Sequence, residues 1–250
     1  KHYVAYGGAE GGRDYNTVDV SERVLREIYL LPFKAAIVDA GAGTIMSAFN
    51  DLNGIPASAN RYTLTSILRE EWGFDGFVVS DWNAIGELLN HGIAGTPAEA
   101  AKESVNAGVD MDMVGNVYQS TLPRLVKERQ VSEEQIDEAV RRILRIKFRL
   151  GLFERPYVDP ERARAVMQSK ENIETALELA QRSMVLLRNE AGLMPLKKDI
   201  ESVAVIGPLA NDREAPLGPW SCQGNPKDVI TLLDGIKSRV SPKTRVLYAK

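Results

Sequence analysis

The stretch GFVVSDWNA, residues 76–84, carries an apolar run straight into a carboxylate and a large aromatic side chain. The apolar part is typical of a buried strand, and working groups in parallel α/β folds project from the carboxyl ends of such strands. Asp81 would therefore be held by rigid backbone at a concave mouth, which makes it a candidate catalytic group. The indole of Trp82 beside it offers a flat apolar face with one donor, suited to stacking on a sugar or an aromatic ring.

The carboxylates near the predicted strand ends could have structural roles instead of catalytic ones. Asp81 precedes a helical pattern, SDWNAIGELL, and its position favours a helix cap about as strongly as a catalytic group. Asp110 and Asp112 in VDMDMV also lie near a predicted strand end and share one face of that strand. Either could supply a second carboxylate, but a packing or loop-pairing role is the favoured interpretation for both.

Lys1 and His2 precede a glycine-rich loop, GGAEGG, whose glycines allow tight turns near a ligand. A Lys-His pair of this kind is usually exposed and without a function. Farther along the loop, Arg13 and Asp14 are expected to form a local ion pair.

The run GTIMSAFNDLNGIP contains two more candidate ligand contacts, Met46 and Phe49, near the end of a predicted strand. Side chains of these types are more often part of a core than of a ligand-binding wall. The Asn53–Gly54 pair that follows predicts a tight turn.

Three apolar runs are spaced like the strands of successive βα units. The predicted strands are Thr44–Phe49, Phe77–Ser80 and Val109–Val114. Helix-start signals accompany them, each a capping side chain followed three residues later by Glu or Gln. These signals are Asp19 with Glu22, Thr96 with Glu99 and Ser132 with Gln135, and another helix has its apolar face at Leu64, Ile67, Leu68 and Trp72.

Buried strands alternating with helices indicate a parallel sheet, either a closed (β/α) barrel or an open doubly wound sheet. The even repeat and the lack of a G-x-G-x-x-G turn favour the barrel. After Gly151 the segment LFERPYVDPERARA is rich in charge and proline, as expected of a linker. We predict a barrel domain over residues 1–150, a linker over 151–172 and a second α/β domain over 173–250.

Composition narrows the classes of function. The chain has 250 residues, 44% of them hydrophobic, and a net charge of −3 without a basic stripe, which gives no electrostatic case for nucleic acid or a membrane surface. The single Cys222 excludes an internal disulfide, and with two histidines in the chain no metal site is predicted. No apolar run reaches the length of a bilayer span, and the compartment is left open.

Five stretches, in this order, resemble bacterial β-glucosidases of glycoside hydrolase family 3: KHYVAYGGAEGGRDYN, SERVLREIYLLPFKAAI, TIMSAFNDLNGIPASAN, LREEWGFDGFVVSDWNAI and LLRNEAGLMPL. The resemblance spans nearly the whole chain. It implies the C-terminal half of a (β/α)8 TIM-like barrel, followed by the beginning of an α/β sandwich domain. The start at Lys1 without a methionine and the strand-like ending TRVLYAK also lead us to expect further residues on both sides.

The resemblance implies roles for the candidate residues. Asp81 would be the catalytic nucleophile, and Trp82 would form a wall beside the leaving-group side of the sugar. Lys1 and His2 would hydrogen-bond hydroxyls of the bound glucosyl ring, and the ammonium of Lys1 would favour the ionised state of Asp81 if the fold brings the two together.

The resemblance also assigns positions to Met46 and Phe49. Met46 matches a pocket-lining position, whereas Phe49 stands where many members of the family carry a tyrosine that would orient the nucleophile. In the β-glucosidase branch the acid/base is a glutamate beyond Lys250, so the isolated chain is expected to be inactive.

The implied activity is that of a retaining exo-β-glycosidase acting on β-glucosides and short β-linked gluco-oligosaccharides, without a cofactor. A β-xylosidase or dual-specificity enzyme and a non-catalytic carbohydrate-binding fragment are the alternatives. The location is left unknown, with a periplasmic or secreted one and a cytoplasmic one as the alternatives. Half a barrel would leave sheet edges and apolar faces uncovered, so we expect the isolated chain to aggregate or to form a homo-oligomer.

Overall fold

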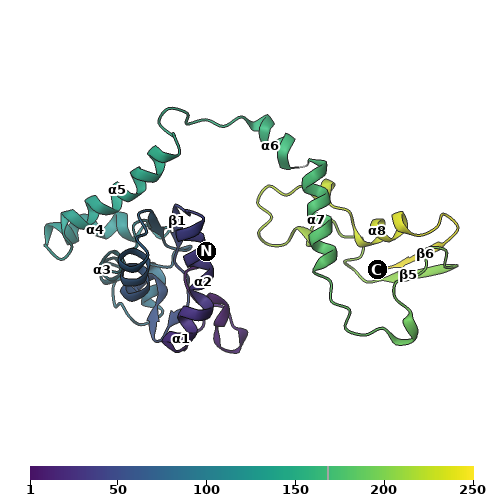
Figure 1. Cartoon of the computed structure of the whole chain (residues 1–250), viewed down its shortest axis with the longest axis horizontal. Coiled ribbons are helices and arrows are strands. Elements are labelled where there is room, and N and C mark those ends of the chain that lie inside the picture. Colours follow the sequence, from purple (N-terminus) through teal and green to yellow (C-terminus); the bar gives the residue numbers. More distant parts are fainter. Residues whose placement is uncertain (168) are drawn as a thin grey trace. The chain divides into compact units, whose positions relative to one another are not determined.

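A computed structural model of the chain describes residues 1–167 and 169–250. The chain divides into two compact units, Lys1–Pro160 and Glu161–Lys250 (Figure 1). Both units combine helices with short parallel strands, which confirms the predicted α/β class. Within the described residues, no helix is both long enough and apolar enough to cross a membrane.

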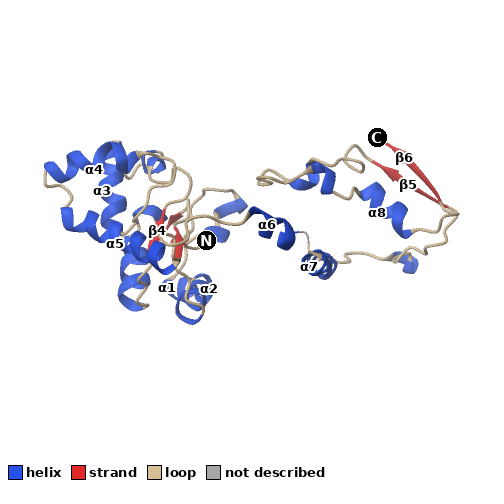
Figure 2. Ribbon diagram, turned by 90° about the horizontal axis from the view of Figure 1, so that it is seen from above, coloured by secondary structure: helices blue, strands red, loops and turns tan. Residues whose placement is uncertain are grey.

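Four segments of unit 1 pair in parallel, in the order in which they occur in the sequence. Strands β1 (Thr44–Met46) and β4 (Phe77–Val79) form the central pair, with Ile45 opposite Val78. Single bridges extend the row on both sides, from Tyr3 to Ser47 and from Val79 to Met111. Figure 2 shows the short strands of this unit, in red, with helices around them.

The third predicted strand, Val109–Val114, is largely wrong, because only the bridge at Met111 joins the sheet. The Asp110 carboxylate accepts the N–H of Val78, and Val114 has a positive φ of 68°. An apolar residue at positive φ cannot continue an extended strand, so the extended conformation cannot include Val114.

The Asn-Gly turn is confirmed. Strands β2 (Asp51–Leu52) and β3 (Ile55–Pro56) form an antiparallel hairpin, and Asn53 and Gly54 between them have φ angles of 51° and 82°. Positive φ at both central residues suits these two residue types.

Helices cover the strands of unit 1. They are α1 (Glu22–Val24), α2 (Leu31–Lys34), α3 (Pro97–Ala107), α4 (Val117–Lys127) and α5 (Glu133–Arg149), with wide π-helical segments at Leu25–Tyr29, Ala35–Asp39 and Tyr62–Glu71. The predicted caps at Thr96 and Ser132 are confirmed, since each side chain accepts the N–H three residues on. The cap predicted at Asp19 is wrong because the hydroxyl of Ser21, not Asp19, accepts the N–H of Val24.

The core of unit 1 lies between the sheet and these helices. Val78 of β4 is fully buried and belongs to one hydrophobic cluster with residues from the first segment and from the helix that precedes the strand, among them Tyr3, Leu64 and Leu68. Gly76, just before β4, is packed so closely that an added Cβ would lie 2.0 Å from the carbonyl oxygen of Gly43. The entry into β4 is therefore fixed by direct backbone packing.

Unit 2 is built around a smaller sheet. It contains β5 (Ser202–Ile206) and β6 (Arg245–Ala249), which pair in parallel, and the helices α6 (Pro160–Met167), α7 (Lys170–Arg182) and α8 (Leu232–Arg239). Its buried core consists of Val205, Ala210 and Leu233. Helix α7 ends at Arg182, where the Ser183 hydroxyl donates to the carbonyl of Ala180.

Candidate active site

Asp81 lies at the carboxyl end of β4, two residues beyond Val79, and only 9% of its surface is exposed. Its Oδ1 accepts the backbone N–H of Trp82 at 2.6 Å. Within the described part of the chain, Oδ2 is buried and accepts no hydrogen bond. One oxygen of this carboxylate is therefore anchored, and the other is buried without a hydrogen-bond donor from the described residues.

The helix-cap alternative for Asp81 is wrong. The next helical turn, Gly86–Leu89, has Ile85 at its N-cap position, and no N–H of that turn bonds to the Asp81 side chain. The carboxylate is held by the residue next to it, before the helix begins.

His2 faces the unpaired oxygen, with its Nε2 3.4 Å from Oδ2 of Asp81. Burial lowers the pKa of the imidazole below its ordinary value of 6.5, and the opposing effect of the Asp81 charge is smaller. A neutral imidazole at this distance can donate to or accept from a hydroxyl group that binds beside the carboxylate.

Lys1 is exposed, and among the described residues no ion pair within 4.0 Å joins it to Asp81. With His2 it lines a cavity of about 550 Å³, whose other walls include Tyr6, Tyr29 and Phe33. Asp81 does not line this cavity, so the structure places Lys1 near the histidine but does not bring its ammonium against the carboxylate.

Trp82 and Met46 flank the same end of the sheet. The Trp82 side chain is 62% exposed, so its apolar face is free to contact a ligand. Met46 is the last residue of β1, is half-buried, and lies opposite Val79 of β4.

Phe49 belongs to an aromatic group that sequence reasoning missed. Its ring centroid lies 4.3 Å from that of Tyr15 and 6.1 Å from that of Tyr6, and the Tyr6 ring lies 5.5 Å from His2. Burial, and next the charge of Glu87, raise the pKa of Tyr15, and Asp81 adds to the same effect. Tyr6 and Tyr15 lie on either side of the glycine-rich loop. The sequence signal that could have identified this aromatic group is the occurrence of two tyrosines shortly after His2.

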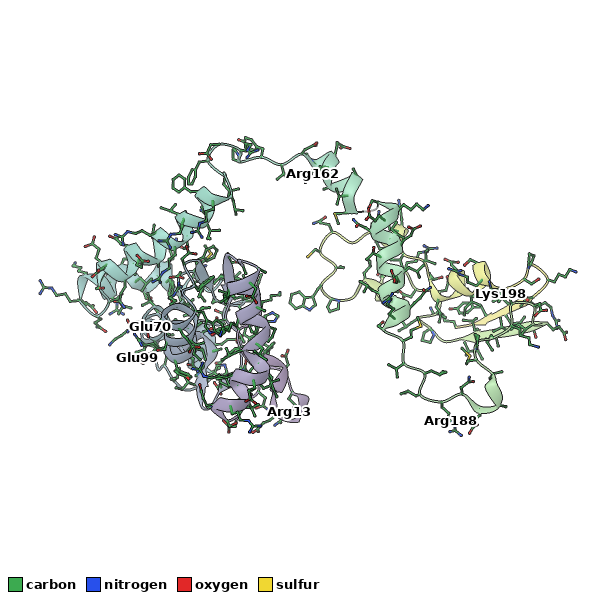
Figure 3. The ribbon with its side chains drawn as sticks, in the orientation of Figure 1. Arg13, Glu70, Glu99, Arg162, Arg188 and Lys198 are labelled. Carbon is green, nitrogen blue, oxygen red and sulfur yellow. The ribbon has the colours of Figure 1, made fainter. Side chains whose placement is uncertain are left out.

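The ion pair predicted between Arg13 and Asp14 is wrong. The Asp14 carboxylate accepts instead from the Tyr6 hydroxyl and from the N–H of Tyr15. Arg13 lies on the loop at the edge of unit 1 (Figure 3). Burial and the hydrogen bond to Asp14 raise the pKa of Tyr6 well above its ordinary value, so this hydroxyl remains a donor.

The other two candidate carboxylates have structural roles, as favoured from the sequence. Asp110 is buried, with its oxygens 2.6 Å from Arg69 and 2.9 Å from Arg142. Asp112 accepts the N–H groups of Val117 and Tyr118 and thereby caps α4. Oδ1 of Asp112 also has no hydrogen-bond partner among the described residues, so the proximity of Oδ2 to His2 is what distinguishes Asp81.

Comparison with protein families gives two matches along the chain. The family description "Glycosyl hydrolase family 3 N terminal domain" matches residues 1–146. The description "Glycosyl hydrolase family 3 C-terminal domain" matches residues 184–247.

Individual relatives agree with these matches. A periplasmic beta-glucosidase of Salmonella typhimurium is 42% identical over all of this chain and 33% of its own length. A beta-xylosidase of Formosa agariphila is 38% identical, over all of this chain and 36% of its own. The crystal structure of a beta-glucosidase from Listeria innocua in complex with glucose matches with a TM-score of 0.88 and 41% identity, over all of this chain and 34% of that one. The chain thus spans about a third of the length of these relatives.

Proposed function

Because the chain belongs to glycosyl hydrolase family 3, we propose that it carries the nucleophile of a retaining exo-β-glycosidase that releases terminal β-D-glucosyl residues. The observation that carries the proposal is the Asp81 carboxylate, with Oδ1 anchored to the Trp82 N–H and Oδ2 unpaired beside His2. The similarity to beta-glucosidases supports β-glucosides and short β-linked gluco-oligosaccharides as substrates.

The proposed reaction has two displacements at the anomeric carbon. In the first, Oδ2 of Asp81 bonds to that carbon while the glycosidic C–O bond breaks, and a general acid protonates the departing oxygen. In the second, water bonds to the same carbon, its proton passes to the same acid/base group, and the Asp81 carboxylate departs. The products are glucose with retained configuration and a free alcohol.

The second carboxyl of a retaining site lies about 5 Å from the nucleophile. As the family resemblance implies, we assign this group to a glutamate beyond Lys250, so residues 1–250 by themselves are proposed to be inactive. The activity is accordingly proposed for a full-length protein that contains this chain.

The remaining candidate residues would bind the sugar. His2 and Lys1 are proposed to contact ring hydroxyls, and the exposed indole of Trp82 would face the leaving group. Met46 and Phe49 would contribute apolar walls, since both are half-buried near the carboxyl ends of the strands.

We propose that unit 1 forms the C-terminal half of a (β/α)8 barrel. The four segments that pair in parallel and in sequence order support this, because neighbouring strands of such a barrel follow each other in the chain. The family matches over residues 1–146 and 184–247 support the predicted domains at 1–150 and 173–250, with a linker between them that contains α6.

The name of the Salmonella relative supports a periplasmic or secreted location, and the cytoplasm is the alternative. Fractionation of the source cells distinguishes them. Self-association of the isolated chain, which we also propose, is measured by light scattering.

The test of the activity is hydrolysis of an aryl β-glucoside by the full-length protein and by its Asp81→Ala variant. Loss of turnover with retained folding is expected for the variant. A second candidate function, β-xylosidase, is favoured by the similarity to the Formosa enzyme. Comparing kcat/KM for aryl β-glucoside and aryl β-xyloside decides between them, and the lack of turnover with either would leave only carbohydrate binding.

A further inference from the structure

Ser80 precedes Asp81, and its side chain is fully buried. The hydroxyl donates to the carbonyl oxygen of Asp81 at 2.9 Å and accepts the N–H of Met113 at 2.8 Å. The hydroxyl therefore acts as a donor and as an acceptor at the same time, and it joins the strand end to a segment 33 residues farther along the chain.

Two further contacts join the same segments. The N–H of Ser80 donates to the carbonyl of Met111 at 2.9 Å, and the N–H of Asn83 donates to the carbonyl of Met113 at 2.9 Å. Gly115 lies so close to the turn that an added Cβ would be 2.8 Å from Oδ1 of Asn83. Residues 80–83 are thus held along one side by residues 111–115.

The orientation of Asp81 depends on this turn. Its Oδ1 is held by the N–H of Trp82, which belongs to the turn itself, and its Oδ2 accepts no hydrogen bond from the described residues. A shift of the turn would therefore carry both oxygens with it. The Ser80 hydroxyl is the side-chain group that bonds directly to the Asp81 carbonyl and to the facing segment.

We propose that Ser80 is a positioning residue that aims the Asp81 carboxylate at the anomeric carbon by fixing the backbone of the turn. The inference rests on the proposed function of Asp81. Because a misplacement of about 1 Å can reduce a rate about 100-fold, loss of the hydroxyl should slow bond formation rather than weaken sugar binding.

The test is the rate of trapping of the full-length protein by 2-deoxy-2-fluoro-β-D-glucosyl fluoride. In this step the carboxylate bonds to the anomeric carbon and fluoride leaves, so no general acid is needed. For Ser80→Ala, the limiting rate constant of trapping should fall about tenfold or more, with little change in the half-saturating concentration. Intact-mass spectrometry measures the fraction of the protein that carries the trapped sugar. The final value of this fraction shows how much of the protein is folded, and the trapping rate is calculated for that part only.

Ser104→Ala is the matched control. Ser104 is equally buried, and its hydroxyl has no hydrogen-bond partner in the described part of the chain, so its removal should leave the trapping rate unchanged. Ser80→Cys keeps most of the side-chain volume with a weaker donor and should trap a few times more slowly than the unaltered protein. If the alanine variant does not fold, the cysteine variant decides the question.

A wild-type trapping rate in the folded fraction of Ser80→Ala, or of Ser80→Cys where the alanine variant does not fold, would overturn the inference. If the unaltered protein is not trapped at Asp81, the proposed function itself fails, which distinguishes the two outcomes.

Discussion

Nε2 of His2 lies 3.4 Å from Oδ2 of Asp81, although the two residues come from segments that are separated by β1 in the row of four parallel segments. Tyr3 pairs with Ser47 next to β1, and β1 pairs with β4, so the sheet register brings the histidine to the carboxylate. The candidate site is thus a product of strand order and register.

Replacing His2 by asparagine should weaken the acid sensitivity of the folded protein. Burial lowers the pKa of His2 below 6.5 in the folded state, so the unfolded state binds more protons between the two pKa values. The free energy of unfolding therefore rises with pH through this window and is not changed further by His2 above it. Thermal midpoints measured from about pH 5 to about pH 7.5 should fall more steeply on acidification for the unaltered protein than for the variant. Equal slopes would contradict the assignment.

Trp82→Ala should weaken substrate binding without changing stability. Its indole is 62% exposed, so little packing is lost, whereas loss of stacking on the leaving group should raise KM for an aryl β-glucoside about two- to tenfold. Tyr157→Ala removes another exposed aromatic, 91% exposed, and serves as the control with unchanged KM. An unaltered KM in the Trp82 variant would remove this residue from the substrate-binding surface.

Asp110→Ala should destabilise unit 1 strongly, although Asp110 takes no part in the proposed chemistry. The substitution leaves Arg69 and Arg142 without their buried partner, and such losses cost about 3–5 kcal/mol. Asp75→Ala breaks an exposed pair with Arg149 and should cost about 1 kcal/mol or less. Urea denaturation of both variants compares them, and similar midpoints would refute the structural role of Asp110.

Gly76→Ala tests the packing that introduces β4. The new Cβ would lie 2.0 Å from the Gly43 carbonyl oxygen, so the backbone must shift at a cost of about 1–3 kcal/mol or more. Gly7→Ala is the control, because nothing lies within 4 Å of its added Cβ. Thermal midpoints should separate the two variants, and a Gly76 variant as stable as the control would show that the close approach is wrong.

Some local signals were predicted correctly, whereas the cap at Asp19 and the Arg13–Asp14 ion pair were wrong because Ser21 and Tyr6 supply the hydrogen bonds instead. The caps at Thr96 and Ser132 and the turn at Asn53 depend on backbone groups within three residues, so the sequence contains their whole cause. The strand predicted at 109–114 failed because the Asp110 carboxylate bonds to Val78, a partner from another strand.

The position of Asp81 at a strand end was predictable, but its surroundings were not. Apolar Phe77–Val79 indicated a buried strand, predicted as Phe77–Ser80, and β4 ends one residue earlier, at Val79. The approach of His2 and the contact of Tyr15 with Phe49 depend on register between distant segments, which apolar periodicity does not determine.

The most direct measurement is the site of covalent labelling when the full-length protein is incubated with a 2-fluoro-glucoside inactivator and digested. The account predicts that one glucosyl group is attached through an ester to the peptide containing Asp81, and that Asp81→Ala is not labelled. Labelling of a different residue, or no labelling of a protein that hydrolyses aryl β-glucosides, would contradict it.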